Sequence, residues 1–84
     1  MRIIETGPIF RMQKRKLGEQ QKKTLVKIIK KLQKNPEIGT QNKGDLEKIW
    51  GYLYEDNLGK VYLAYRFDQN SITLISFSRI SVRI

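Results

Sequence analysis

The sequence predicts an α+β domain in which two N-terminal helices pack on one face of a mostly antiparallel, four-stranded sheet. Residues 46–77 contain three β-branched and aromatic runs, separated by turn-forming residues at 56–59 and 68–71, which is typical of two consecutive hairpins. Residues 19–34 carry apolar side chains at helical spacing and supply the apolar partner that such a sheet needs. The predicted order is strand, helix, helix, strand, strand, strand, within a single domain of residues 1–84.

The first two elements are short. A strand is expected at Met1–Glu5, where two isoleucines are adjacent. Thr6 can cap a helix, and Pro8 near the first helical position has no N–H that needs a partner, so a helix is predicted over Pro8–Lys16. Its apolar residues Ile9, Phe10 and Met12 are expected inward and its cations Arg11, Lys14, Arg15 and Lys16 outward.

The second helix, Glu19–Lys34, has the strongest helical pattern in the chain. Four apolar residues fall at i, i+3, i+4 and i+7, namely Leu25, Ile28, Ile29 and Leu32. The stripe continues toward the N-terminus in steps of four, through Gln21 to Leu17. An acidic residue lies in the first turn and lysines lie in the last, as the helix dipole favours. Asn35-Pro36 ends the helix.

A loop is expected over Glu37–Asp45, because this segment is polar and shows no periodicity. Three strands should follow at Lys48–Glu55, Lys60–Asp68 and Ser71–Phe77. In the middle strand Val61, Leu63, Tyr65 and Phe67 alternate with Tyr62, Ala64 and Arg66. The first set is predicted to pack on the helices and the second to line the open face of the sheet. The tail, residues 78–84, continues the alternation of apolar and polar residues.

The charge of the chain indicates a polyanionic partner. It has 17 Lys and Arg against 8 Asp and Glu, a formal charge of +9 and a pI near 10.1. Such a surplus attracts nucleic acid, an anionic membrane or an acidic protein. The lysines and arginine predicted to contact nucleic acid are Lys22, Lys23, Lys27, Lys30, Lys34, Lys43, Lys48 and Arg83. The alternative interpretation is a solvated helix face.

The composition excludes several classes of chemistry. The chain has no cysteine and no histidine, which removes disulfides, thiol nucleophiles, the usual zinc sites and the commonest general base. The carboxylates show no metal-binding spacing, so no metal and no cofactor is expected. No apolar run reaches the roughly 20 residues of a membrane helix, and no signal peptide is recognisable. We therefore expect a soluble, cytoplasmic protein without membrane association.

Three segments carry a resemblance to a known family. They are Leu32–Gly39, which ends a Lys-rich helix in Asn-Pro-Glu-Ile-Gly, then Lys43–Leu46, and then Val61–Asp68 with its Tyr-rich strand. Their order and spacing resemble the RelE/ParE superfamily of bacterial type II toxins, and the resemblance extends from about Phe10 to Phe77.

The resemblance implies a small toxin that is neutralised by a cognate antitoxin. One branch of the superfamily cuts messenger RNA on the ribosome, without a metal, and another inhibits DNA gyrase. The nuclease branch uses Lys, Arg and Tyr side chains on the open sheet face and in the C-terminal tail to hold phosphate and orient the attacking 2′-hydroxyl. By this likeness Arg66 and Arg79 are the predicted phosphate contacts, with Tyr62 or Tyr54 orienting a base. The alternative interpretation is that the arginines form surface ion pairs, with Asp68, Glu55 or Asp56 as partners, and that the strand tyrosines are core or cross-strand residues.

The chain departs from the nuclease pattern in three places. The strand region Ile49–Tyr54 carries no lysine, and the open-face arginine of the next strand falls at or beside Tyr62, which leaves Arg66 as the nearest cation. The tail SRISVRI does not resemble the basic, Tyr-containing ending of the family. One hypothesis is that the tail is a truncated or frameshifted version of a longer ancestor, which would leave a toxin fold with little or no activity. The primary prediction is a ribosome-dependent mRNA endonuclease, and the alternative is a non-nuclease member, either a gyrase inhibitor or an inactive protein that binds only its antitoxin.

Overall fold

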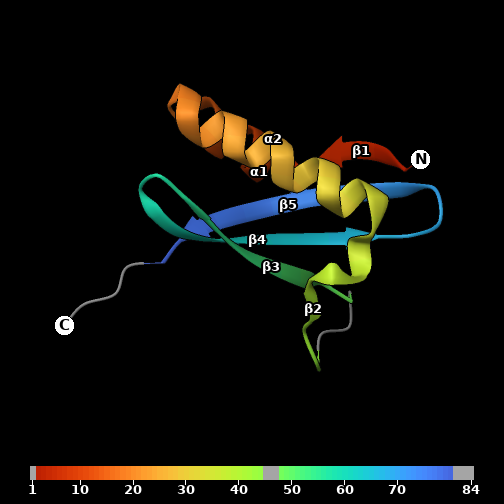
Figure 1. The fold of residues 1–84 in the computed structure, drawn as a ribbon. Coiled ribbons are helices and arrows are strands. Elements are labelled where there is room, and N and C mark those ends of the chain that lie inside the picture. The colour runs from red at the N-terminus through yellow and green to blue at the C-terminus, as the bar shows by residue number, and fades with distance from the viewer. Residues whose placement is uncertain (1, 45–47, 81–84) are drawn as a thin grey trace.

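The fold has two layers, with both α-helices on one face of a curved sheet (Figure 1). The computed structural model describes residues 2–44 and 48–80. Its elements are β1 (Ile3–Thr6), α1 (Pro8–Arg15), α2 (Glu19–Lys34), the 3-10 turn η1 (Pro36–Ile38), β2 (Thr40–Gln41), β3 (Trp50–Asp56), β4 (Gly59–Phe67) and β5 (Ser71–Arg79). The predicted α+β layout and its helix-on-sheet packing are confirmed.

The predicted sheet was wrong in strand number, and the structure decides the direction of the first strand, which the sequence left open. The sheet has five strands in the order β1-β5-β4-β3-β2. β3, β4 and β5 form the predicted antiparallel meander, whereas β1 pairs parallel with β5, from Ile3 opposite Ser71 to Thr6 opposite Leu74. The direction of β1 depends on how the helices return the chain across the sheet, which no local pattern records.

The missed strand lies inside the predicted loop. After α2, the Asn35 side chain accepts a hydrogen bond from the Glu37 amide and starts η1. Gly39 then brings the chain close to β3, since a Cβ there would lie 2.6 Å from the Gly51 carbonyl oxygen. β2 follows with two residues paired to β3. Two residues are too few to show an alternating pattern, so this strand left no sequence signal.

The second helix has the predicted bounds, and its predicted stripe is buried. Leu25 and Leu32 are fully buried and Gln21 is 9% exposed. The Gln21 amide donates to the Asn57 side chain at 2.6 Å, which joins the first half of α2 to the turn between β3 and β4. Gly59 completes that turn with φ +124°, a conformation that favours glycine.

The first helix contacts the sheet through a narrower face than predicted. Phe10 is buried, but Ile9 and Met12 are 58% and 59% exposed, so their predicted inward orientation was wrong. The second inward residue is Gln13, whose amide donates to the Phe77 carbonyl at 2.7 Å and accepts from the Phe77 amide at 2.9 Å. β1 pairs with β5 only as far as Leu74. Beyond that point the Gln13 side chain forms the hydrogen bonds to the β5 backbone that a neighbouring strand would otherwise form.

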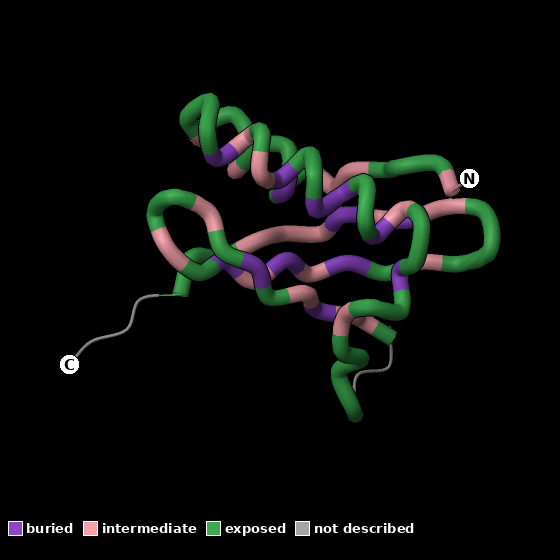
Figure 2. Tube along the Cα trace, in the orientation of Figure 1, coloured by how far each residue is buried: buried purple, intermediate pink, exposed green. Residues whose placement is uncertain are grey.

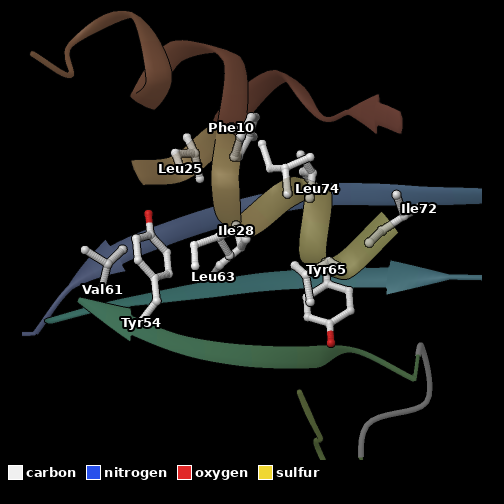
Figure 3. Close-up of a cluster of buried hydrophobic side chains, with 11 residues drawn as sticks. Phe10, Leu25, Ile28, Tyr54, Val61, Leu63, Tyr65, Ile72 and Leu74 are labelled. Carbon is white, nitrogen blue, oxygen red and sulfur yellow. The ribbon is translucent and has the colours of Figure 1, made fainter. Parts of the chain in front are cut away.

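The core lies between the helices and the inner face of the meander (Figures 2 and 3). Val61, Leu63 and Tyr65 are at most 1% exposed, and Phe67 packs against them, which confirms the predicted inner face of β4. Trp50 and Tyr52 pack against the same core from β3. Most strand aromatics are therefore structural. Among the described residues, no helix is long and apolar enough to cross a membrane.

Candidate functional site

The open face of the sheet carries a shallow hollow next to the start of α1. β4 presents Tyr62, Ala64 and Arg66 on this side, opposite the buried set. The hollow has a volume of ≈ 350 Å³ and is lined by Gly7, Pro8, Ile9, Ile49, Arg66, Thr73 and Ile75. Three of the seven lining residues are isoleucines, and the guanidinium of Arg66 is the only charged group among the lining residues. The hollow therefore combines an apolar surface with one cation.

Tyr62 lies elsewhere on the open face, packed over β3. A Cβ placed on Gly51 would overlap the Tyr62 ring, so the glycine clears the space that the ring occupies. Tyr62 does not line the hollow that contains Arg66. The two residues are four positions apart on one strand, or about 13 Å along the backbone. Tyr62 and Arg66 thus lie on the same face of the sheet, as predicted. The sequence did not indicate that Gly51 leaves room for the Tyr62 ring.

Arg79 lies on the other face of the sheet, at its far end. It stands opposite Val61, on the side that carries the helices, whereas Arg66 stands opposite Thr73. Its guanidinium donates two hydrogen bonds of 2.8 Å, one to each carboxylate oxygen of Asp56. The Asp56 side chain is 2% exposed, and its Oδ1 also accepts from the Leu58 amide at 2.9 Å. The structure therefore separates Arg79 from Arg66 and engages it in a bidentate ion pair.

Tyr54 belongs to this second cluster. It is 8% exposed and lies in the core, where burial, and next the charge of Asp56, raise its pKa to about 12. At neutral pH the phenol is protonated, and such a group is a weak general base. The four predicted catalytic residues thus form two groups on opposite faces: Tyr62 and Arg66 on the open face, and Tyr54 and Arg79 on the helix face.

The ion pair between Arg79 and Asp56 predicts an acid-sensitive contribution to stability. The hydrogen bond from Arg79, the largest cause, holds the Asp56 pKa below its ordinary value of 3.8. A carboxyl with a lowered folded-state pKa stabilises the fold above its unfolded pKa, and the contribution is lost as the pH falls through the folded value. We expect Arg79→Gln to reduce the free energy of unfolding by about 1–2 kcal/mol at pH 7 and by progressively less as the pH falls below 3.8, the ordinary pKa of Asp56.

Urea unfolding of both proteins across this pH range measures the difference. Arg15→Gln is the matched control, because Arg15 is exposed and its loss changes the net charge equally. Asp68, whose pKa is also lowered by the amides of Asn70 and Ser71, contributes equally to every protein compared. An equal loss of stability at pH 7 and pH 3 would show that the ion pair does not contribute in this way.

The predicted nucleic-acid contacts fall into three locations. Lys23, Lys27, Lys30 and Lys34 are exposed along α2, and Lys43 and Lys48 are exposed on either side of residues 45–47. Lys22 is half-buried and lines a hollow together with Arg11, Lys14 and Arg15 of α1. These three cations were predicted to point outward, but no function was predicted for them. Arg83 lies outside the described residues. No described group of His, Cys, Asp or Glu side chains has the arrangement of a metal site.

A groove of ≈ 260 Å³ separates the helices from β1. Its lining is mainly apolar, with lysines at its margins: Ile4, Thr6, Phe10, Lys14, Val26, Ile29, Lys30, Gln33 and Leu74. Val26 is 41% exposed and Ile4 is 36% exposed. The groove runs beside β1, the outer strand at this edge of the sheet. An exposed apolar groove beside a sheet edge is suited to binding another polypeptide.

Comparisons with known proteins agree with this architecture. A family model described as "ParE-like toxin of type II bacterial toxin-antitoxin system" matches residues 4–81. Among solved structures, a chain of the intact RelBE toxin–antitoxin complex from E. coli superposes with a TM-score of 0.76 at 17% sequence identity. The alignment covers 98% of the present chain and 100% of that chain. A search of curated protein sequences gave no match.

Proposed function

The chain belongs to the ParE-like toxins of type II bacterial toxin–antitoxin systems, and from this premise we propose that it arrests growth by binding a protein target rather than by cutting RNA. One observation carries the choice: the predicted catalytic residues are divided between the two faces of the sheet. The proposed binding surface is the open-face hollow around Arg66.

Metal-free cleavage of RNA makes demands that this division does not meet. A side chain must take the proton from the attacking 2′-hydroxyl, and cations must surround the phosphate as negative charge builds on it. Tyr54 is buried with a raised pKa, and Arg79 is held by Asp56 on the helix face. Neither can reach a phosphate bound beside Arg66 while the sheet stays intact.

The composition of the hollow supports a protein ligand. Ile9, Ile49 and Ile75 are three of its seven lining residues, and Arg66 is the charged residue among the seven. Apolar area with an arginine at the margin is the composition that protein interfaces favour. DNA gyrase is the target that the resemblance to the non-nuclease branch implies. mRNA cleavage on the ribosome remains the second candidate, because Tyr62 and Arg66 share the open face.

Purified protein tests these two functions directly. We expect inhibition of DNA supercoiling by gyrase, and no new mRNA 5′ ends when translating ribosomes are incubated with the protein. Ile9→Glu places a charge in the hollow and should weaken inhibition at least tenfold, whereas Ile38→Glu, an exposed isoleucine outside the hollow, should leave it unchanged. Ribosome-dependent cleavage with normal supercoiling would establish the nuclease instead. Arrest with neither activity would exclude both targets.

We also propose that the cognate antitoxin occupies the groove between the helices and β1. The family implies such a partner, and the similar RelBE structure is that of a toxin–antitoxin complex. Lys14 and Lys30 at the margins favour an acidic, amphipathic segment laid against Val26 and Ile29.

A substitution in this groove is expected to separate neutralisation from toxicity. Val26→Glu should weaken antitoxin binding at least tenfold, because it buries a carboxylate in the apolar contact. Ile38→Glu is a close control, since both side chains are 41% exposed and Ile38 lies outside the groove. Titration calorimetry measures the affinity, and co-expression measures growth rescue. Equal affinity of the two variants would place the antitoxin elsewhere.

A further inference from the structure

Four cations from the two helices line one open hollow on the helical layer. Its volume is ≈ 480 Å³, and its lining residues are Arg11, Lys14, Arg15 and Lys22. The first three fall at i, i+3 and i+4 of α1 and therefore share one side of that helix. Lys22 comes from the first turns of α2, which the short Lys16–Gly18 connection folds back beside α1. The cluster thus depends on the packing of the hairpin and not on a run of basic residues.

The cations of this hollow are not neutralised by carboxylates of the described residues. Among the described residues, none of the four forms an ion pair with a carboxylate. Glu19, on the preceding turn from Lys22, is exposed and does not pair with it. Four positive charges held close together repel one another, and a bound anion relieves that repulsion.

Two features make the cluster more ordered than a set of surface side chains. The Arg11 guanidinium donates to the Thr6 backbone carbonyl and lies 3.4 Å from the Thr6 hydroxyl, which fixes its position against the end of β1. Lys22 is half-buried, so its stem is held between the helices. Among the described residues, Arg11 is thus the one cation of the four with a hydrogen bond, and the exposed lysines of α2 have none.

We infer that this hollow, defined by Arg11, Lys14, Arg15 and Lys22, binds the phosphodiester backbone of a nucleic acid. Arginine presents a planar fork of donors that fits phosphate oxygens, and lysine adds a point charge. The lining residues include no aromatic or amide side chain that would read a base, so the contact fixes position without sequence preference. They also include no apolar anchor of the kind that binds a peptide, which favours phosphate over an acidic protein segment.

Binding of a labelled oligonucleotide of mixed sequence tests the inference, measured by fluorescence anisotropy with the full-length protein. The hollow variant carries Lys14→Gln, Arg15→Gln and Lys22→Gln. The control variant carries Lys23→Gln, Lys27→Gln and Lys34→Gln, which remove the same charge from the outer side of α2. Thermal unfolding of both variants checks that the fold is retained.

The hollow variant should bind at least tenfold more weakly, with the slope of log affinity against log salt reduced by about 2–3. The control should stay within about twofold of the unchanged protein. Equal losses in the two variants would overturn the inference, because diffuse net charge would then explain binding. Binding of a polyglutamate peptide with equal affinity would overturn it too, in favour of an acidic protein ligand.

The binding assay is repeated with single-stranded RNA and with duplex DNA of the same sequence, to identify the class of nucleic acid. A preference of tenfold or more for either one assigns the backbone that the hollow recognises, and equal affinity assigns phosphate geometry common to both. Ile9→Glu should bind oligonucleotides normally, because it changes the sheet hollow and not the helical one. Failure of the proposed protein target and failure of this inference are therefore separate results.

Discussion

Replacing Phe10 with alanine is expected to lower the free energy of unfolding by about 3–5 kcal/mol. Phe10 is 1% exposed and is the one fully buried side chain of α1, where its ring meets the edge of Phe77 with centroids 5.6 Å apart. The stability of a domain of this size is about 4–13 kcal/mol in total. The substitution therefore removes a large fraction of it and leaves a cavity between α1 and β5.

Met12→Ala is the matched control on the same helix. Met12 is 59% exposed, so its truncation should change stability by less than about 0.5 kcal/mol. Urea unfolding followed by circular dichroism gives both values, and hydrogen exchange shows whether α1 detaches before the rest of the fold. Similar values for the two variants would mean that Phe10 does not hold α1 on the sheet.

The second large effect is expected where Tyr62 covers Gly51. Gly51→Ala should destabilise the fold by about 1–3 kcal/mol and displace the Tyr62 ring, because the added methyl group occupies the space of the ring. In a double-mutant cycle, Gly51→Ala should cost much less once Tyr62→Ala has removed the ring, giving a coupling of about 1–2 kcal/mol.

Leu58→Ala supplies the comparison, since Leu58 is 64% exposed and lies in the turn between β3 and β4. Its truncation should leave the effect of Gly51→Ala unchanged. Additive effects of Gly51→Ala and Tyr62→Ala would contradict the packing described. A change in growth arrest with Gly51→Ala would link the position of Tyr62 to toxin action.

Periodic segments of the chain were predictable from sequence, and pairing between distant segments was not. The stripe from Gln21 to Leu32 gave the bounds and the inner face of α2, since every turn repeats the same burial. Alternation along β4 separated Val61 and Leu63 from Tyr62 for the same reason. In α1 the pattern was too short, and a polar residue, Gln13, took an inward position that apolarity suggested for Met12.

The site was harder to predict, because catalysis requires side chains to meet on one face. The sequence left open whether Arg66 and Arg79 contact phosphate or form surface ion pairs. The bulge in the β4–β5 ladder between Ala64 and Tyr65 and the position of Asp56 decide this for Arg79, which pairs with Asp56. The cluster of Arg11, Lys14, Arg15 and Lys22 was hidden for a related reason. Its members come from two helices whose relative rotation no single-helix pattern contains.

The parallel pairing of β1 with β5 has a consequence for how the protein is made. Ile3 finds its partner in Ser71, so β1 stays without its neighbour until most of the chain has left the ribosome. Contacts between residues so far apart in sequence form late and slow folding. Both the sheet hollow, through Thr73 and Ile75, and the helical groove, through Leu74, depend on β5. The surfaces proposed here for binding are therefore incomplete during synthesis, and they are completed only when β5 pairs with β1.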